Sequence, residues 1–259
     1  MAPKFVPALA ALLLLSACEA LRGSERTSVT TAQTVASAHW FRGVPLSQGA
    51  VTQGDLTVNT PLSTGGVLSF TTWYNAELTN DPGDARFAEG QGGEASEIDL
   101  VFHYSHPVGP VNLSIGGVGY HFPELLPSTR EAYLGATVQL FGIAHSLTAY
   151  YDIDLLEDVY LSYQASRGFT LDEHWSAALA VLLGYMGDDQ AAFWFGEEHS
   201  GFSDVLLTGT LSYRFDANTS VFLRGASVTV PDDELAQALD DSGEDDSGLW
   251  LALGAAWGL

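Results

Sequence analysis

The sequence predicts an all-β protein, a transmembrane antiparallel up-and-down β-barrel of about 12 strands. Three observations predict this fold: apolar and polar residues alternate along the chain, short and long connections alternate between the strands, and aromatic residues gather at strand ends. The composition agrees, because 27 glycines and 11% aromatic residues in 259 are typical of a turn-rich β protein.

The alternation has a period of two residues. In the segment 97–104, Ile98, Leu100, Phe102 and Tyr104 share one face, and Asp99, Val101 and His103 share the other. The segments 146–154, 158–165 and 204–214 alternate in the same way. Each such strand has one apolar and one polar face.

The connections alternate in length. The expected strands lie near 29–42, 50–60, 65–76, 96–106, 109–121, 130–140, 143–153, 157–166, 172–186, 202–214, 219–229 and 248–259. Short connections alternate with longer ones, of which 77–95, 187–201 and 230–247 are long and polar, although 154–156 is short. Transmembrane barrels have short periplasmic turns and longer outer loops, and an even strand number places both termini in the periplasm.

Aromatic residues lie at both ends of the expected strands. Those at the long-loop ends are Trp40, Trp73, Tyr74, Tyr120, Phe122, Tyr151 and Tyr185. Those at the short-turn ends are Tyr104, Phe141, Phe169, Trp175, Tyr213, Phe215 and Trp257. Two such rings suit the two boundaries of a membrane, although aromatic residues also favour strand ends in any sheet.

The N-terminus predicts export and lipidation. Residues 1–17 have a positive Lys4 and an apolar run too short to span a membrane, and they end before Cys18, the only cysteine. Leu15-Ser16-Ala17-Cys18 resembles the lipobox of bacterial lipoproteins, which implies a lipid on Cys18 and the help of the lipoprotein-sorting machinery. The expected parts are a signal peptide (1–17), a lipidated periplasmic tether (18–28) and the barrel (29–259). A plain secretory signal is the alternative.

The last strand resembles a known sorting signal, and the N-terminal half of the chain resembles a known protein family. Gly254, Trp257 and Leu259 resemble the C-terminal signal read by the barrel-assembly machinery, with Leu in place of the usual Phe. The segments HWFRGVPLSQ (39–48), EID (97–99), GYHFP (119–123) and EAYLG (131–135) resemble, in order, the Gcw_chp family, which includes the TorF-type porins. The resemblance spans about residues 38–140 and implies a barrel in the outer membrane of a Gram-negative bacterium, with no catalytic residues.

Charge limits the partners. Lys and Arg number 9 against 32 Asp and Glu, so the net charge of −23 excludes a nucleic-acid binder. No cofactor or metal motif is present. The strand phase predicts a lumen lined by Asp99, His103, Glu131, Tyr133, Tyr150, Asp152, Asp154, Tyr160, Gln164, Asp204, Thr208, Arg214 and Arg224. More carboxylates than arginines favour cations, unless Arg214 and Arg224 pair with these acids and close the lumen.

The segment 231–248 holds eight acids and no Lys or Arg. It is expected to be a solvated outer loop. The alternative is that its carboxylates bind divalent cations beside the phosphates of lipopolysaccharide, which with the outer-membrane lipids is an expected partner.

The predicted function is a porin for passive diffusion of a small neutral or cationic solute. A structural or surface-interaction barrel without an open channel and a soluble periplasmic all-β lipoprotein are the alternatives. An enzyme is the competing class: His103 and Ser105 have the spacing of the His–Ser pair of outer-membrane phospholipase A, and His121 with Glu124, or His199 with Glu197 and Glu198, could serve a hydrolase. The phase points His103 inward near a short turn, which is unsuited to a lipase of the outer leaflet.

Overall fold

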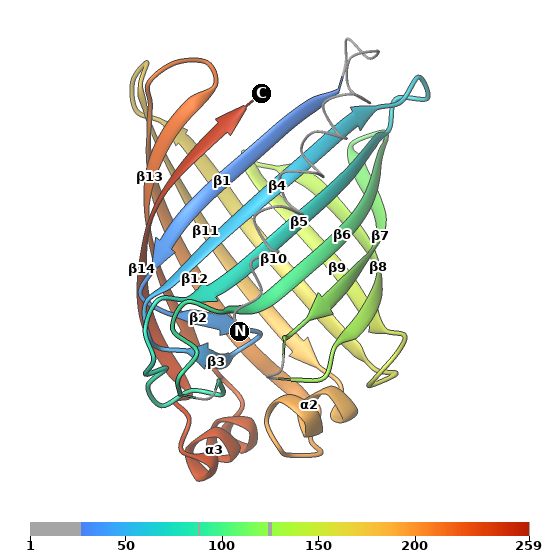
Figure 1. The fold of residues 1–259 in the computed structure, drawn as a ribbon. Helices are drawn as coiled ribbons and strands as arrows, with labels where there is room; N and C mark the ends of the chain where they lie inside the picture. The colour runs from blue at the N-terminus through green and yellow to red at the C-terminus, as the bar shows by residue number, and fades with distance from the viewer. Residues whose placement is uncertain (1–26, 88, 124–125, 259) are drawn as a thin grey trace.

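The computed structural model describes residues 27–258 except 88, 124 and 125. Twelve antiparallel strands form a closed barrel in the order β1-β14-β13-β12-β11-β10-β9-β8-β7-β6-β5-β4. The barrel closes because β1 pairs with β14 on one side and with β4 on the other (Figure 1). The predicted fold is therefore confirmed, and closure leaves no edge of the wall unpaired.

The wall strands and the elements between them have the following bounds. The wall consists of β1 (Ser28–Ala36), β4 (Val51–Pro61), β5 (Val67–Glu77), β6 (Ala95–Val108), β7 (Val111–His121), β8 (Thr129–Leu140), β9 (Ile143–Asp152), β10 (Val159–Thr170), β11 (Trp175–Met186), β12 (Gly201–Arg214), β13 (Thr219–Thr229) and β14 (Ser247–Gly258). The connections hold β2 (His39–Phe41), β3 (Val44–Ser47), α2 (Asp188–Trp194) and α3 (Asp233–Ser242).

The two ends of the barrel differ. The five short turns lie at one end, together with the start of β1 and the end of β14, and the longer connections with both helices lie at the other (Figure 1). Side chains brace the short turns: Oδ1 of Asp172 accepts hydrogen bonds from the backbone N–H groups of Trp175 and His174, which lower the pKa of this carboxyl group. The alternation of connection length predicted this division.

Two predictions are wrong at the long-loop end of the barrel. The first strand, expected over 29–42, ends at Ala36, and 39–47 form a separate hairpin, β2–β3, that does not join the wall. The segment 231–248, expected to be a loop, contains α3. Asp232 caps this helix, because its Oδ1 accepts hydrogen bonds from the backbone N–H groups of Glu234 and Leu235.

The outer face of the wall is apolar. Many mid-strand apolar side chains on this face are exposed, among them Leu100 (51%), Phe102 (54%) and Leu134 (63%). Their neighbours in sequence, such as Asp99 and Tyr133, face the interior. The two-residue alternation therefore divides an apolar exterior from a polar interior, as in a membrane barrel.

The aromatic residues follow the expected rings only in part. At the short-turn end, Phe169, Trp175 and Trp257 lie on the outer face and are about two-fifths exposed. At the long-loop end, Tyr120 and Phe122 are buried instead. Trp40 and Trp73 also face inward, with Trp40 against Gly248 and Trp73 against the ring of His39. The expected ring at this end is wrong for these four residues, because they face the loop that is inserted into the barrel, and Tyr120 and Phe122 join a core there.

Among the described residues, no helix is long and apolar enough to cross a membrane. The signal peptide 1–17, Cys18 and nearly all of the tether lie outside the described residues, as does Leu259.

Candidate functional site

The connection between β1 and β4 folds back into the mouth of the barrel at its long-loop end. Its hairpin β2–β3 turns through Arg42 and Gly43, which both have positive φ (50° and 91°). This suits a two-residue turn with two left-handed residues. A Cβ on Gly43 would overlap the backbone carbonyl oxygen of Ser203 in the wall, so glycine is required there. Val44 and Leu46 of β3 are fully buried.

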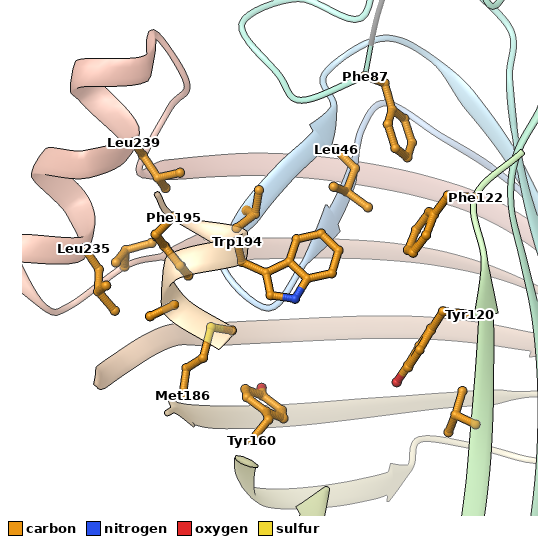
Figure 2. Close-up of a cluster of buried hydrophobic side chains, with 14 of the residues drawn as sticks. Leu46, Phe87, Tyr120, Phe122, Tyr160, Met186, Trp194, Phe195, Leu235 and Leu239 are labelled. Atoms are coloured by element: carbon orange, nitrogen blue, oxygen red, sulfur yellow. The ribbon is translucent and has the colours of Figure 1, made fainter. Parts of the chain in front are cut away.

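An apolar cluster joins this hairpin to the other outer loops. Trp194 and Phe195 come from α2 and the residue after it, Leu235 and Leu239 from α3, and Phe87 from the connection between β5 and β6 (Figure 2). They pack with Leu46 of the hairpin and with Phe122 and Met186 at the ends of wall strands. We call this cluster with the hairpin the plug. It is a hydrophobic core at the long-loop end, built by the connections that follow β1, β5, β11 and β13 together with strand ends.

Arg42 fastens the plug to the wall. Its guanidinium donates to both carboxylate oxygens of Glu131 on β8, at 2.7 and 2.6 Å, and to Oε1 of Gln190 on α2, at 3.0 Å. It lies 4.0 Å from the ring centroid of Tyr160, a cation–π contact. The hydroxyl of Tyr120 donates to the same carboxylate at 3.0 Å. The ion pair is buried and bidentate, the arrangement in which arginine and carboxylate bind most specifically.

A second polar network lies at the base of the hairpin. Nε2 of His39 lies 2.6 Å from Oε2 of Glu97 on β6. Glu77 on β5 is almost fully buried and accepts hydrogen bonds from the hydroxyls of Ser47 (2.7 Å) and Ser96 (2.9 Å). Both ends of the hairpin are therefore hydrogen-bonded to wall carboxylates, which satisfies these buried acids.

The lumen beyond the plug is open to water. Interior side chains near the long loops are buried, as shown by Glu131 (3%) and Asp204 (4%). Interior side chains near the short turns, such as Asn112, Ser176 and Arg214, are exposed. The plug thus occupies the interior at the long-loop end, and the interior at the short-turn end is exposed.

The strand registers place the residues that the phase assigned to the lumen, with one exception, on the interior face. The interior face carries Asp99, His103, Glu131, Tyr133, Tyr150, Asp152, Tyr160, Asp204, Arg214 and Arg224, which were expected to line the pore. Gln164 and Thr208 lie on the same face. The exception is Asp154, which follows the end of β9 and pairs with the exposed Arg130 at 2.9 Å. Asp154 is therefore not a lumen residue.

These residues do not form one site. Glu131, Tyr150, Tyr160 and Asp204 gather around Arg42, and the Tyr160 hydroxyl donates to Asp204 at 3.1 Å. The ring nitrogen Nδ1 of His103 and the hydroxyl of Tyr133 form a hydrogen bond of 2.7 Å. Asp152 instead caps the loop after β9, where its Oδ1 accepts three backbone hydrogen bonds.

Arg214 and Arg224 do not pair with acids in the described part of the chain. Arg214 donates to the backbone carbonyl oxygen of Glu173 at 2.9 Å, and Arg224 to the hydroxyl of Thr210 at 3.3 Å. The expected alternative, in which these two arginines neutralise the lumen, is wrong. The arginine that pairs with a lumen acid is Arg42, which binds Glu131 and which the sequence placed in a strand; its position in the HWFRG segment was the available signal.

The segments considered for catalysis and for metal binding have other partners. Between residues 27 and 258, with the gaps given above, no hydrogen bond joins His103 to Ser105, and no group of acids, His and Cys is arranged to hold a metal ion. His121 bonds Ser128 at 2.8 Å, and Glu124 lies outside the described residues. His199 contacts Asp232 and Glu234 of the acidic segment at 3.3 and 3.2 Å, rather than the side chains of Glu197 and Glu198.

Comparison with known proteins supports the fold. No protein-family model matches the chain, and no curated protein matches its sequence. Among solved structures, the NanC porin is similar with a TM-score of 0.53 at 9% identity, over 88% of this chain and 98% of that one. The KdgM porin is similar with a TM-score of 0.48 at 10% identity, over 89% and 98%. At this identity the NanC likeness shows a shared closed-barrel fold.

Proposed function

We propose that the chain is a porin-like barrel of a Gram-negative outer membrane, with its short turns in the periplasm. The observation that carries this proposal is the outer face, where large apolar side chains are exposed on strand after strand, as Leu134 and Leu253 are at 63% and 64%. A soluble protein rarely exposes a continuous apolar surface of this extent, whereas lipid covers it at no cost. The likeness to a porin fold agrees with this placement.

Placing one arginine on the outer face tests the membrane proposal. We expect Leu134→Arg to lower the free energy of unfolding in lipid vesicles by about 2–4 kcal/mol, because the charge enters hydrocarbon. Leu78→Arg is the matched control, since Leu78 is 50% exposed but lies in a loop just after β5. Denaturant titration in vesicles measures both. Equal, small effects of the two changes would favour the soluble alternative.

We infer further that the lumen passes small neutral or cationic solutes and that the plug restricts this passage. Three acids, Asp99, Glu131 and Asp204, lie near Arg42 of the hairpin. Oδ1 of Asp99 is buried and has no hydrogen-bond partner in the described part of the chain. A buried oxygen of this kind favours a water or a cation beside it. The excess of carboxylates supports cation preference.

Current recordings in planar bilayers test the passage. We expect a small conductance whose reversal potential, in a salt gradient, shows cation preference, and we expect Asp99→Asn to weaken that preference. Asp233→Asn makes the same change of charge on the exposed face of α3 and should leave it unaltered. An absence of current at every voltage would favour the second candidate, a structural or surface barrel without a through-passage, which the apolar packing of the plug supports.

We also propose that Cys18 carries the lipid and that the chain is a relative of the Gcw_chp family. The lipobox and the ordered segments from His39 to Gly135 support these two proposals. The mass of the mature protein tests the first: cleavage before Cys18 with added acyl chains is expected, and Cys18→Ser should abolish both. A mature chain that starts elsewhere and lacks acyl chains would contradict it.

A further inference from the structure

The outer face carries an apolar groove that extends from Ile143 on β9 across β10 to β14 and has a volume of about 960 Å³. Leucines that project from the wall border it, with Leu179 exposed by 59%, Leu207 by 53% and Leu251 by 63%. Gly209 and Gly225 form its floor. The groove therefore lies on the surface that the proposed membrane placement turns toward lipid.

Strand registers show that the groove is built from two rows of paired residues. One row runs Arg167, Leu179, Gly209, Gly225, Leu251, and the other runs Ala165, Val181, Leu207, Ser227, Leu249. Four strand spacings of about 4.8 Å make each row about 19 Å long. One leaflet of hydrocarbon is about 15 Å thick, so a row inclined to the membrane has the length of one leaflet.

The groove runs from the short-turn side toward the long-loop side. Arg167 lies three residues before the end of β10 at Thr170, whereas Leu251 lies seven before the end of β14 at Gly258. With the short turns in the periplasm, the Arg167 end lies near the periplasmic boundary of the membrane. A chain that entered at Arg167 would follow the floor toward the middle of the bilayer.

Arg167 is the cation at this entrance, and it has no anionic partner within the described residues. Its guanidinium lies 5.2 Å from the ring centroid of Phe169, which is on the same outer face. Arg42, Arg86 and Arg130 each bind a carboxylate, at 2.6–2.9 Å. Arginines close to a membrane boundary extend toward the headgroups, where phosphate is the anion that they meet.

We propose that this groove is a binding site for one phospholipid of the periplasmic leaflet, with an acyl chain over Gly209 and Gly225 and the phosphate on Arg167. The proposal rests on the proposed placement in the membrane. The unpaired charge selects the occupant, because a second copy of the chain docked here would press Arg167 against an apolar wall. A lipid satisfies both the apolar rows and the cation.

Filling the groove tests the site. Replacing both floor glycines (Gly209→Leu with Gly225→Leu) should fit the fold, because a Cβ at these positions meets only Leu179 and Leu251, at 3.6 and 3.4 Å. In native mass spectrometry of the full chain from mild detergent, we expect wild type to retain one phospholipid and the filled variant to lose it. Gly119→Leu is the matched control, since Gly119 faces outward on β7, away from the groove.

The headgroup contact is tested separately. With added phosphatidylglycerol and phosphatidylcholine, wild type should prefer the anionic lipid, and Arg167→Gln should lose this preference but keep the bound chain. Arg130→Gln removes another exposed cation and should retain the preference for the anionic lipid. Equal retention of lipid by the filled variant, or a protein dimer that the filling disrupts, would overturn the proposal.

The membrane proposal can fail independently of this one. A filled variant that still partitions into vesicles and shows heat-modifiable migration, yet binds lipid as wild type does, overturns only the lipid site. A wild-type chain that stays in the aqueous phase removes the membrane placement itself.

Discussion

Arg42→Met should open the plug. The substitution leaves Glu131 buried without its cation, and breaking such a pair by removing one partner costs about 3–5 kcal/mol. Because Arg42 also binds Gln190 of α2, the hairpin and the helix should loosen together. We expect a several-fold larger conductance in planar bilayers and a lower temperature for the loss of loop structure. Arg42→Lys should have a conductance and a loop stability between those of wild type and Arg42→Met, since lysine keeps the charge but cannot bind both carboxylate oxygens.

Two controls separate the ion pair from the loss of charge. The double variant Arg42→Met with Glu131→Met removes both partners and should recover much of the lost stability, because no charge remains buried alone. Arg214→Gln removes an exposed arginine near the short turns and should leave the plug unchanged. Wild-type conductance and stability in Arg42→Met would show that this pair does not hold the plug.

Trp194→Ala should weaken the plug without opening the barrel wall. Trp194 is 3% exposed and packs against Phe41, at 4.8 Å between ring centroids, and Phe122, at 6.2 Å. Truncating a buried tryptophan costs about 3–5 kcal/mol. Since the strand ladder is untouched, heat-modifiable migration should persist while the loops at 78–94 and 187–200 become faster targets of limited proteolysis.

The matched control is Trp175→Ala. Trp175 is 40% exposed on the outer face at the short-turn end, so the same truncation leaves no cavity in the plug. In Trp175→Ala, the protease should therefore cut the long loops at the wild-type rate. If both tryptophan variants were cut equally fast, the cluster around Trp194 would not be the core that orders the loops.

Much of the wall could be predicted from the sequence. In a barrel strand, successive side chains point to opposite faces, so the position of a residue in the alternation gives the direction of its side chain. Strand β13 was expected at 219–229 and lies at Thr219–Thr229, and the interior phase of Asp99 follows from its apolar neighbours Ile98 and Leu100. Because alternation indicates which face a residue occupies, it predicts both the barrel fold and the residues that face the lumen.

The plug was not predictable in the same way, because its contacts join loops that are distant in sequence. Residues 39–42 were assigned to the first wall strand and 43–49 to a connection, whereas 39–47 form a separate hairpin through the left-handed turn at Arg42 and Gly43. In α3, the four-residue spacing of Leu235 and Leu239 was a helical signal, but the surrounding acids indicated a loop. Aromatic residues at the long-loop end could not be assigned to the membrane boundary or to the interior without knowing that a loop enters the mouth.

The most direct test of the account compares the surroundings of two neighbouring residues on β6. In a Cys18→Ser background, Phe102→Cys and His103→Cys each receive a polarity-sensitive fluorophore, and the protein is placed in vesicles that contain a lipid-borne quencher. We predict strong quenching and a blue-shifted emission at position 102, and neither at position 103. Quenching at 103 but not at 102, or at neither position, would contradict a barrel with lipid outside and water inside.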